Sequence, residues 1–259
     1  MPLGHAKGIS VWLIPSEPES ALLQQLMSRH PKPSIQHSFP HFHPHVTLAT
    51  IPIRRPPASS IPTRSEEEEE DETSNNSNWY HNYNNDNVDP TTLLALREAI
   101  PLGQRALRDI RFARVLTGDS YFLSIYIALV TPSTELAQLR AALSRVVQQQ
   151  VLLVGGAGGE EKTSSPLLLP AFPHLSLFYV KDEEAHARVR LLQEMEREGV
   201  VRHSDDGLSV ALRCTERAAD GEDDGCVLEG FTATQIWIVE CEGPVEEWKV
   251  LDKILLATS

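Results

Sequence analysis

The sequence predicts an α+β fold in which largely antiparallel sheets are covered by helices. Three observations support this class. Apolar or alternating segments typical of strands are separated by segments with helical periodicity. A hairpin signal, Thr117-Gly118-Asp119-Ser120, interrupts that alternation and argues against a doubly wound parallel sheet. The chain also follows one plan twice: a strand, a helix, and then a strand that begins with Pro-His.

The first predicted strand covers residues 9–14, a continuous apolar run. Ser16 and Glu19 then have the spacing of a capping box and predict a helix that ends before Pro31. Residues 44–51 alternate in hydropathy, which is typical of a strand. The chain therefore opens with a β-α-β arrangement.

The following segments supply the remaining elements. Asp89-Pro90 predicts the start of a second helix that extends to about residue 99. Two strand-like segments, 109–116 and 121–130, flank the hairpin signal, and Ser133 precedes a helix with one apolar face. The last expected elements are a strand within 167–180, a helix over 182–199, and strands over 208–214 and 231–240.

Acidic residues are concentrated in two segments. Residues 58–88 combine few apolar side chains with dense charge and many Asn, so we expect a low-complexity insertion that does not order. Within it, residues 66–72 carry seven acidic side chains, and residues 219–225 carry four more. Without these eleven charges the formal net charge of −13 becomes −2. The chain lacks the basic excess that duplex nucleic acid requires, whereas a small phosphate stays open as a ligand.

The cysteines and the apolar segments indicate the compartment. Cys214, Cys226 and Cys241 form no C-x-x-C pattern, which favours a reducing compartment and argues against a Cys-rich zinc module. A disulfide between Cys214 and Cys226 is left open. The apolar run near the N-terminus is too short for a signal peptide, and no segment has the length of a transmembrane helix. We expect an intracellular protein with no integral membrane segment.

Two segments of the chain match position by position. They are Pro44-His45-Val46-Thr47-Leu48 and Pro173-His174-Leu175-Ser176-Leu177. Residues two apart on a strand point to the same face, so His45 projects with Thr47, and His174 with Ser176. The aliphatic neighbours then project into the core. If two lobes face each other, two imidazoles and two hydroxyls converge on one space.

This set of groups suits hydrolysis of a phosphodiester by in-line displacement. One imidazole takes a proton from water, and the other gives a proton to the leaving oxygen. The two hydroxyls would hold the non-bridging phosphate oxygens as negative charge builds up on them. The scheme needs no metal and no cofactor.

The paired motifs resemble those of the 2H phosphoesterase superfamily. Together with residues 8–15 and 243–248, they are similar to the fungal 2′,3′-cyclic-nucleotide 3′-phosphodiesterases. The resemblance covers nearly the whole chain apart from the acidic segments and a glycine-rich loop. It implies one bilobal, LigT-like domain over residues 1–259, with pseudo-twofold symmetry. Two antiparallel sheets would face a central cleft, with the helices outside.

The resemblance also implies a reaction and its residues. A nucleoside 2′,3′-cyclic phosphate would be opened to a 2′-phosphate, and ADP-ribose 1″,2″-cyclic phosphate, a by-product of tRNA splicing, to ADP-ribose 1″-phosphate. His45 and His174 would be catalytic, and Thr47 and Ser176 would bind phosphate. We favour His174 as the group that activates water and His45 as the acid, although the duplicated motif itself permits either order. The resemblance further implies Golgi association, and we expect a monomer.

Tyr179 is a candidate for stacking against the base of the substrate, because related enzymes have an aromatic residue near this place. Its odd offset from His174 points it away from the site unless the strand ends or bulges near Phe178. Core packing is the alternative interpretation.

Three other functions stay open. His41, His43 and His45 alternate and offer three imidazoles to a zinc ion, although Pro40 and Pro44 disturb the strand. A second alternative is a nucleotide-binding protein without turnover, which the two intact motifs disfavour. A third is action on RNA ends or 2′–5′ linkages, as by ligase-like 2H proteins, for which the chain has no evident basic track.

Overall fold

The computed structural model describes residues 8–29, 39–52, 89–101, 103–130, 133–154, 173–215 and 225–257. The helices are α1 (Glu17–Arg29), α2 (Pro90–Ala99), α3 (Thr134–Val154) and α4 (Ala185–Arg197). The first strands are β1 (Gly8–Pro15), β2 (Val46–Pro52), β3 (Leu107–Thr117), β4 (Ile125–Leu129) and β5 (His174–Phe178). The later strands are β6 (Val201–His203), β7 (Val210–Arg213), β8 (Val227–Leu228), β9 (Gly230–Cys241) and β10 (Lys249–Leu255). Three short 3₁₀ turns are η2 (Tyr121–Leu123), η3 (Asp182–Glu184) and η4 (Val245–Glu247).

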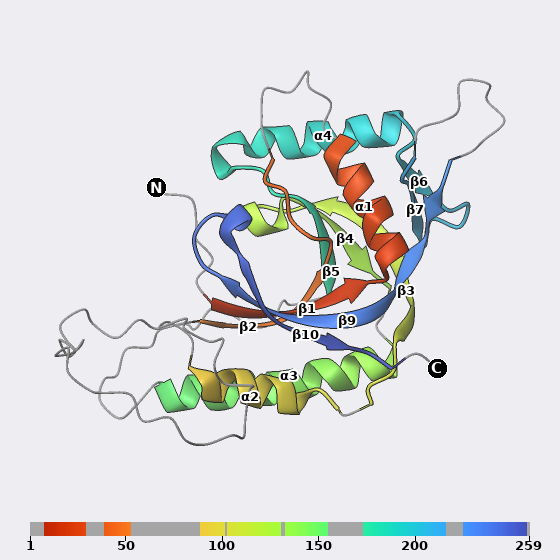
Figure 1. The fold of residues 1–259 in the computed structure, drawn as a ribbon. Helices are drawn as coiled ribbons and strands as arrows, with labels where there is room; N and C mark the ends of the chain where they lie inside the picture. The colour runs from red at the N-terminus through yellow and green to blue at the C-terminus, as the bar shows by residue number, and fades with distance from the viewer. Residues whose placement is uncertain are drawn as a thin grey trace, which may run out of the picture.

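Seven strands form one antiparallel sheet in the order β1-β2-β5-β4-β3-β9-β10, and β1 also pairs with β9. This extra pairing closes a ring, which Figure 1 shows as β1 and β9 lying beneath β4 and β5. Two groups of strands make up the ring, β9-β1-β2 and β5-β4-β3, and β10 extends the first group by pairing with β9. The two groups are joined by β2–β5 at one edge and by β3–β9 at the other. Strands β6, β7 and β8 form a separate small sheet.

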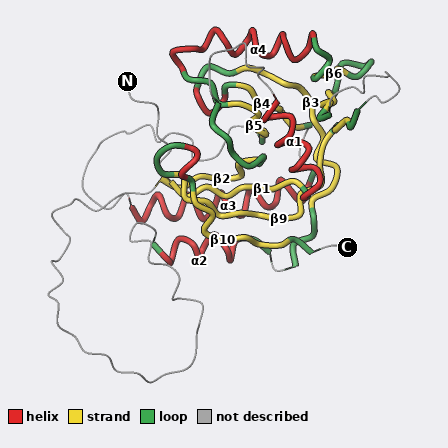
Figure 2. Tube along the Cα trace, turned by 45° about the horizontal axis from the view of Figure 1, so that its top comes forward, coloured by secondary structure: helices red, strands yellow, loops and turns green. Residues whose placement is uncertain are grey.

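The helices lie on opposite sides of the strands. Helices α2 and α3 run side by side beneath β1, β9 and β10, whereas α4 lies at the far end of the molecule, above β4 and β5 (Figures 1 and 2). Alternate residues of β1 explain why α2 and α3 pack beneath the sheet. Ile9, Val11 and Leu13 are apolar and are buried in the main core, which also contains residues of both helices. The intervening residues of β1, among them Trp12 and Ile14, belong to a second apolar cluster on the other face.

The α+β class with antiparallel sheets is confirmed, and the sheets expected to face each other are joined at both edges. One half of the predicted capping box is observed at the start of α1, where the Glu19 carboxylate accepts a hydrogen bond from the Ser16 amide at 3.3 Å. The Ser16 hydroxyl donates to the same carboxylate at 2.6 Å. Asp89 accepts a hydrogen bond from the Thr91 amide at 3.0 Å. The same Glu19 carboxylate also accepts from the Thr232 amide at 3.0 Å, so the start of α1 is fixed to β9.

Some elements differ from the expectation. The strand expected over 121–130 begins only at Ile125, because Tyr121–Leu123 form the turn η2. Ser124 explains the difference: its hydroxyl donates to the Tyr121 carbonyl at 2.6 Å and accepts from the Val180 amide at 2.9 Å. The helix expected from Asp182 likewise begins with a 3₁₀ turn. Strands β6, β8 and β10 were not expected.

Several sequence expectations fall outside what the structure tests. The insertion at 58–88 and most of the acidic segment at 219–225 lie outside the described residues. The single bilobal domain over 1–259 stays a prediction. Within the described part of the chain, no helix is long and apolar enough to cross a membrane. Cys214, Cys226 and Cys241 are free thiols, with the Cys214 amide donating to the Cys226 carbonyl at 2.8 Å.

Candidate active site

The two Pro-His motifs meet where β2 and β5 pair. Val46 is the direct antiparallel partner of Leu175. Continuing this register by one residue in each direction places His45 opposite Ser176 and Thr47 opposite His174. Side chains directly opposite each other share a face of the sheet, so the four polar groups form a two-by-two array with a local twofold relation. The sequence predicted this convergence, and the register supplies its geometry.

Burial separates the two faces of this strand pair. Val46 and Leu175 are fully buried in the main core, as alternation requires. On the other face the array is graded: His45 and Ser176 are 3% and 5% exposed. Thr47 and His174 are half-buried. One histidine thus lies at the bottom of the array and the other closer to solvent.

His45 is held on two sides. Its ring stacks on the indole of Trp12 with centroids 3.7 Å apart and planes 10° apart. Its Nδ1 lies 2.6 Å from the carbonyl oxygen of His43. A carbonyl only accepts hydrogen bonds, so Nδ1 carries the proton and the lone pair of the neutral ring is on Nε2. The backbone carbonyl of His43, two residues before His45, therefore fixes the tautomer of the His45 ring.

Burial also controls the charge of His45. Loss of hydration against Trp12 lowers the pKa of His45 to about 3, an effect that the His43 carbonyl opposes and that the nearby His43 and His174 rings reinforce. The free protein at neutral pH therefore holds a neutral His45. The register places the two imidazoles on one face of adjacent strands, where the charge of His174 adds to this shift.

His174 has a different setting. Its ring meets that of Tyr126 edge-on, with centroids 5.3 Å apart, and Tyr126 pairs with Ser176 across β4 and β5. The hydroxyl groups of the array are placed by the same registers. Ser176 Oγ lies 3.4 Å from the Phe122 carbonyl, and Thr47 lies opposite Trp12 on β1.

Tyr179, the candidate for base stacking, lies just after β5. One extra residue on β5 shifts the register with β4 between Ser176 and Phe178, so strand alternation does not extend to Tyr179. The Tyr179 hydroxyl lies close enough to Ser176 for that side chain to affect its pKa, which burial raises overall. The ring is 4% exposed and stacks on Phe42 at 4.3 Å. One ring face is thus covered by Phe42, and a contact of Tyr179 with a base stays a prediction.

Sequence reasoning missed most of the aromatic wall of the site. Parity on β1 leaves Trp12 looking like a core residue, yet it stacks on His45 and pairs with Trp237 across β1 and β9. Trp248, after η4, lies 5.7 Å from Trp12 between ring centroids. Alternation along β1 could have indicated this. Trp12 and Ile14 share one face of the strand, and Val11 and Leu13, which are in the main core, share the opposite face.

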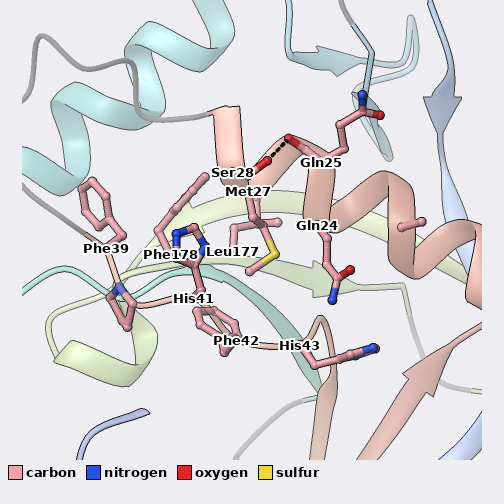
Figure 3. Close-up of a pocket in the computed structure, with 12 residues that line it drawn as sticks. Gln24, Gln25, Met27, Ser28, Phe39, His41, Phe42, His43, Leu177 and Phe178 are labelled. Carbon is pink, nitrogen blue, oxygen red and sulfur yellow. Dashed lines mark hydrogen bonds between the residues drawn. The ribbon is translucent and has the colours of Figure 1, made fainter. Parts of the chain in front are cut away.

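The other two histidines of the candidate zinc cluster are not members of the array, although His43 lies next to it. His43 packs on Trp237 at 4.4 Å between ring centroids, and burial lowers its pKa. His41 is exposed and lines a cavity of about 590 Å³ beside α1, shown in Figure 3 with Met27 and Phe178. Among the residues that the structure describes, no group of three or more His, Cys, Asp or Glu is arranged to hold a metal ion.

The fold and the paired motifs define a class, the two-histidine phosphoesterases. A family model of cyclic phosphodiesterase-like proteins matches residues 80–256, more than half of the chain, and the chain belongs to this family. It is therefore a phosphoesterase that acts on phosphodiester bonds. The match includes the motif on β5 and begins after the motif on β2. The narrower resemblance to fungal enzymes stays a prediction.

Several solved structures are similar to the chain at low identity. E. coli LigT complexed with NADP⁺ has 10% identity and a TM-score of 0.46, over 98% of this chain and 99% of that one. E. coli LigT complexed with 3′-AMP has 10% identity and a TM-score of 0.45, over 96% and 98%. A structure described as a phosphoesterase has 10% identity and a TM-score of 0.44, also over 96% and 98%. Among curated proteins no match was found.

Proposed function

We propose that this protein hydrolyses nucleoside 2′,3′-cyclic phosphates to 2′-phosphates with His45 and His174 as its acid–base pair. The observation that supports this most strongly is the array on β2 and β5, because one strand pair presents two imidazoles and two hydroxyls on a single face. Groups on opposite sides of a small cyclic phosphate suit in-line displacement, in which the attacking and leaving oxygens lie on opposite sides of phosphorus.

The reaction follows from the roles of the four groups. His174 Nε2 or Nδ1 takes a proton from water as the water oxygen bonds to phosphorus. The bond between phosphorus and the 3′ oxygen then breaks, and His45 supplies the proton that this oxygen needs. Thr47 and Ser176 donate hydrogen bonds to the non-bridging oxygens, where negative charge accumulates. The product is a 2′-phosphate with a free 3′ hydroxyl.

Burial favours this order of roles. The attacking water comes from solvent, and His174 is the more accessible of the two rings. His45 is neutral in the free protein, but a bound phosphate anion would stabilise its imidazolium in the same desolvated position. His45 would thus take up a proton as substrate binds, with Nδ1–H still donating to the His43 carbonyl.

The test is turnover of adenosine 2′,3′-cyclic phosphate by the purified chain in EDTA, with the product identified by phosphorus NMR. We expect the 2′-phosphate to form, and His45→Ala and His174→Ala to abolish its formation. His203→Ala is the control, because His203 is an exposed histidine on β6. A 3′-phosphate product, or full activity in either variant of the array, would refute the proposal.

A substrate with sulfur in place of the bridging 3′ oxygen separates the two histidines. A thiolate leaves without protonation, so loss of the acid no longer matters, whereas loss of the base still does. We expect the sulfur substrate to restore turnover to His45→Ala and not to His174→Ala. The opposite pattern would exchange the two roles.

ADP-ribose 1″,2″-cyclic phosphate is the second substrate that we propose, because it presents the same strained five-membered phosphodiester. Its product would be ADP-ribose 1″-phosphate. Golgi association, the monomeric state and the exclusion of duplex nucleic acid stay predictions from the sequence.

A further inference from the structure

A continuous row of residues crosses the sheet from the catalytic array to its edge. Thr47 on β2 pairs with Trp12 on β1, Trp12 pairs with Trp237 on β9, and Trp237 pairs with Lys253 on β10. Directly paired residues of an antiparallel sheet share a face, so Lys253 lies on the face that carries Thr47. Three strand spacings of about 4.8 Å put its Cα roughly 14 Å from that of Thr47.

The side chain of Lys253 reaches back along this row toward the array. Its Nζ lies 4.3 Å from the centroid of the Trp237 ring, over the ring face. The indole Nε1–H of Trp237 donates to Gln235 Oε1 at 2.8 Å, which fixes the orientation of this ring. His43 packs on the same indole, and its backbone carbonyl holds His45. The ammonium group is thus one aromatic residue away from the indole on which His45 stacks.

The charge of Lys253 is directed at the site side of the sheet. In the part of the chain that the structure describes, no carboxylate forms an ion pair with it. The adjacent Asp252 instead faces α2, where it accepts from Arg97 at 2.8 Å. The positive charge also lowers the pKa of His43, which agrees with the short separation of the two side chains.

We infer that Lys253, above the floor made by Trp237 and His43, is a second anion subsite that binds a phosphate on the 5′ side of the substrate. This inference rests on the proposed function. The catalytic array holds the cyclic phosphate with histidines and hydroxyls, none of which supplies a permanent positive charge. A Lys ammonium binds phosphate as a point charge and so fits a second, mobile phosphate group. The protein would then prefer cyclic phosphates that carry a further phosphate or diphosphate.

A lysine on an edge strand has an ordinary explanation, because it discourages pairing with other sheets. Lys249 is the matched control for that role. It lies on the same strand and is exposed, but it pairs with Glu240, whose neighbour on β1 is Ile9 of the main core face. Lys249 therefore starts from the opposite face of the sheet.

The experiment compares adenosine 2′,3′-cyclic phosphate with and without a 5′-phosphate as substrates. We expect wild type to prefer the 5′-phosphorylated form. Lys253→Met should raise the KM for the 5′-phosphorylated nucleotide about 5-fold, which corresponds to the loss of one solvent-exposed ion pair. Its kcat, and both constants for the nucleotide without a 5′-phosphate, should stay unchanged. Lys253→Arg should retain the preference and Lys249→Met should leave it intact. The preference should shrink at high salt, because an exposed charge is screened.

Several results would overturn the subsite. They are a wild type without preference, a Lys253→Met variant that retains it, and an equal loss in Lys249→Met. If wild type turns over neither nucleotide, the proposed function fails, and calorimetry with inorganic diphosphate tests the subsite separately. Lys253→Met should then weaken diphosphate binding and Lys249→Met should not, with thermal melting confirming that both variants fold. No difference between them would refute the subsite.

Discussion

The motif on β2 and the motif on β5 have the same pattern and opposite environments. His45 is 3% exposed, stacked on Trp12 and tied to a backbone carbonyl, whereas His174 is half-buried and meets Tyr126 edge-on. The local twofold relation at Val46 and Leu175 makes the backbones equivalent, so the neighbours cause the difference. A duplicated motif thus supplies two chemically identical groups, and the surrounding aromatic residues give each one a different burial and a different set of contacts.

The largest expected effect comes from removing either imidazole. His45→Ala and His174→Ala should each lower kcat for the cyclic phosphate by about 10³-fold, within the range of general acid–base catalysis. Initial rates by phosphorus NMR measure this. If the two motifs form one unit, the double variant should be only slightly slower than either single variant. A double variant slower by the product of both losses would show that the histidines act independently.

The hydroxyl groups should have the next largest effect. Thr47→Val and Ser176→Ala each remove one donor to a non-bridging oxygen and should lower kcat by about 10²-fold. Ser176 also lies close to the Tyr179 hydroxyl, so its loss should perturb binding as well, and KM should rise more than in Thr47→Val. Steady-state kinetics on both variants test this asymmetry. Unchanged kcat in both would remove the hydroxyls from the proposed reaction.

The contrast in burial predicts a pH dependence of stability. The pKa of His45 is about 3 in the folded protein and near 6.5 in an unfolded chain. The unfolded state therefore binds more protons below pH 6.5, and stability falls as the pH drops from 6.5 toward 3. Between pH 7.5 and pH 5 this single group should cost about 2 kcal/mol.

Urea denaturation of wild type and His45→Gln at both pH values measures this loss. The Gln variant has no imidazole to protonate, so its decrease in unfolding free energy should be smaller by that amount. Thr47→Val, a variant of the same array that removes no imidazole, is the control, and its decrease should stay close to that of wild type. Equal slopes in wild type and His45→Gln would mean that His45 titrates normally.

The sequence was sufficient to predict which side chains make up the array, because that prediction depends on neighbouring residues of each strand. Alternation on a strand determines that His45 goes with Thr47 and that Val46 goes inward, and duplication indicates that the two strands meet. Trp12 could not be assigned in the same way. Its partner His45 is far away in the chain, and the register shift between β1 and β2 at Val11 and Trp12 decides what it faces.

The same limit applies to other long-range features. The hydrogen bond of the Ser124 hydroxyl with Val180, which accompanies the turn η2 in place of a strand, joins residues 56 positions apart. The closure of the ring by β1 and β9 depends on the far end of the chain. The starts of α1 and α2 were predicted well because Ser16 and Asp89 act within three residues of their own positions.

The smallest expected effect comes from deleting part of the chain that follows the motif on β2. The segments that follow the two motifs differ. After β2 the chain continues into residues 53–88, which lie outside the described part, whereas after β5 it enters η3 and α4 within a few residues. If the chemistry belongs to the array itself, deleting residues 64–88 should leave kcat and KM for the cyclic phosphate within about 2-fold, because a polar, highly charged segment adds little to a core. Deleting the three-residue turn η3 should by contrast lower the melting temperature. Asp182 in this turn forms an ion pair with the buried Arg188, which would lose its partner. A 64–88 deletion that loses turnover while keeping its melting temperature would show that the acidic segment acts on the site. One that also loses its fold would show that this segment contributes to the structure, and the equivalence of the two motif regions would then hold only for the strands.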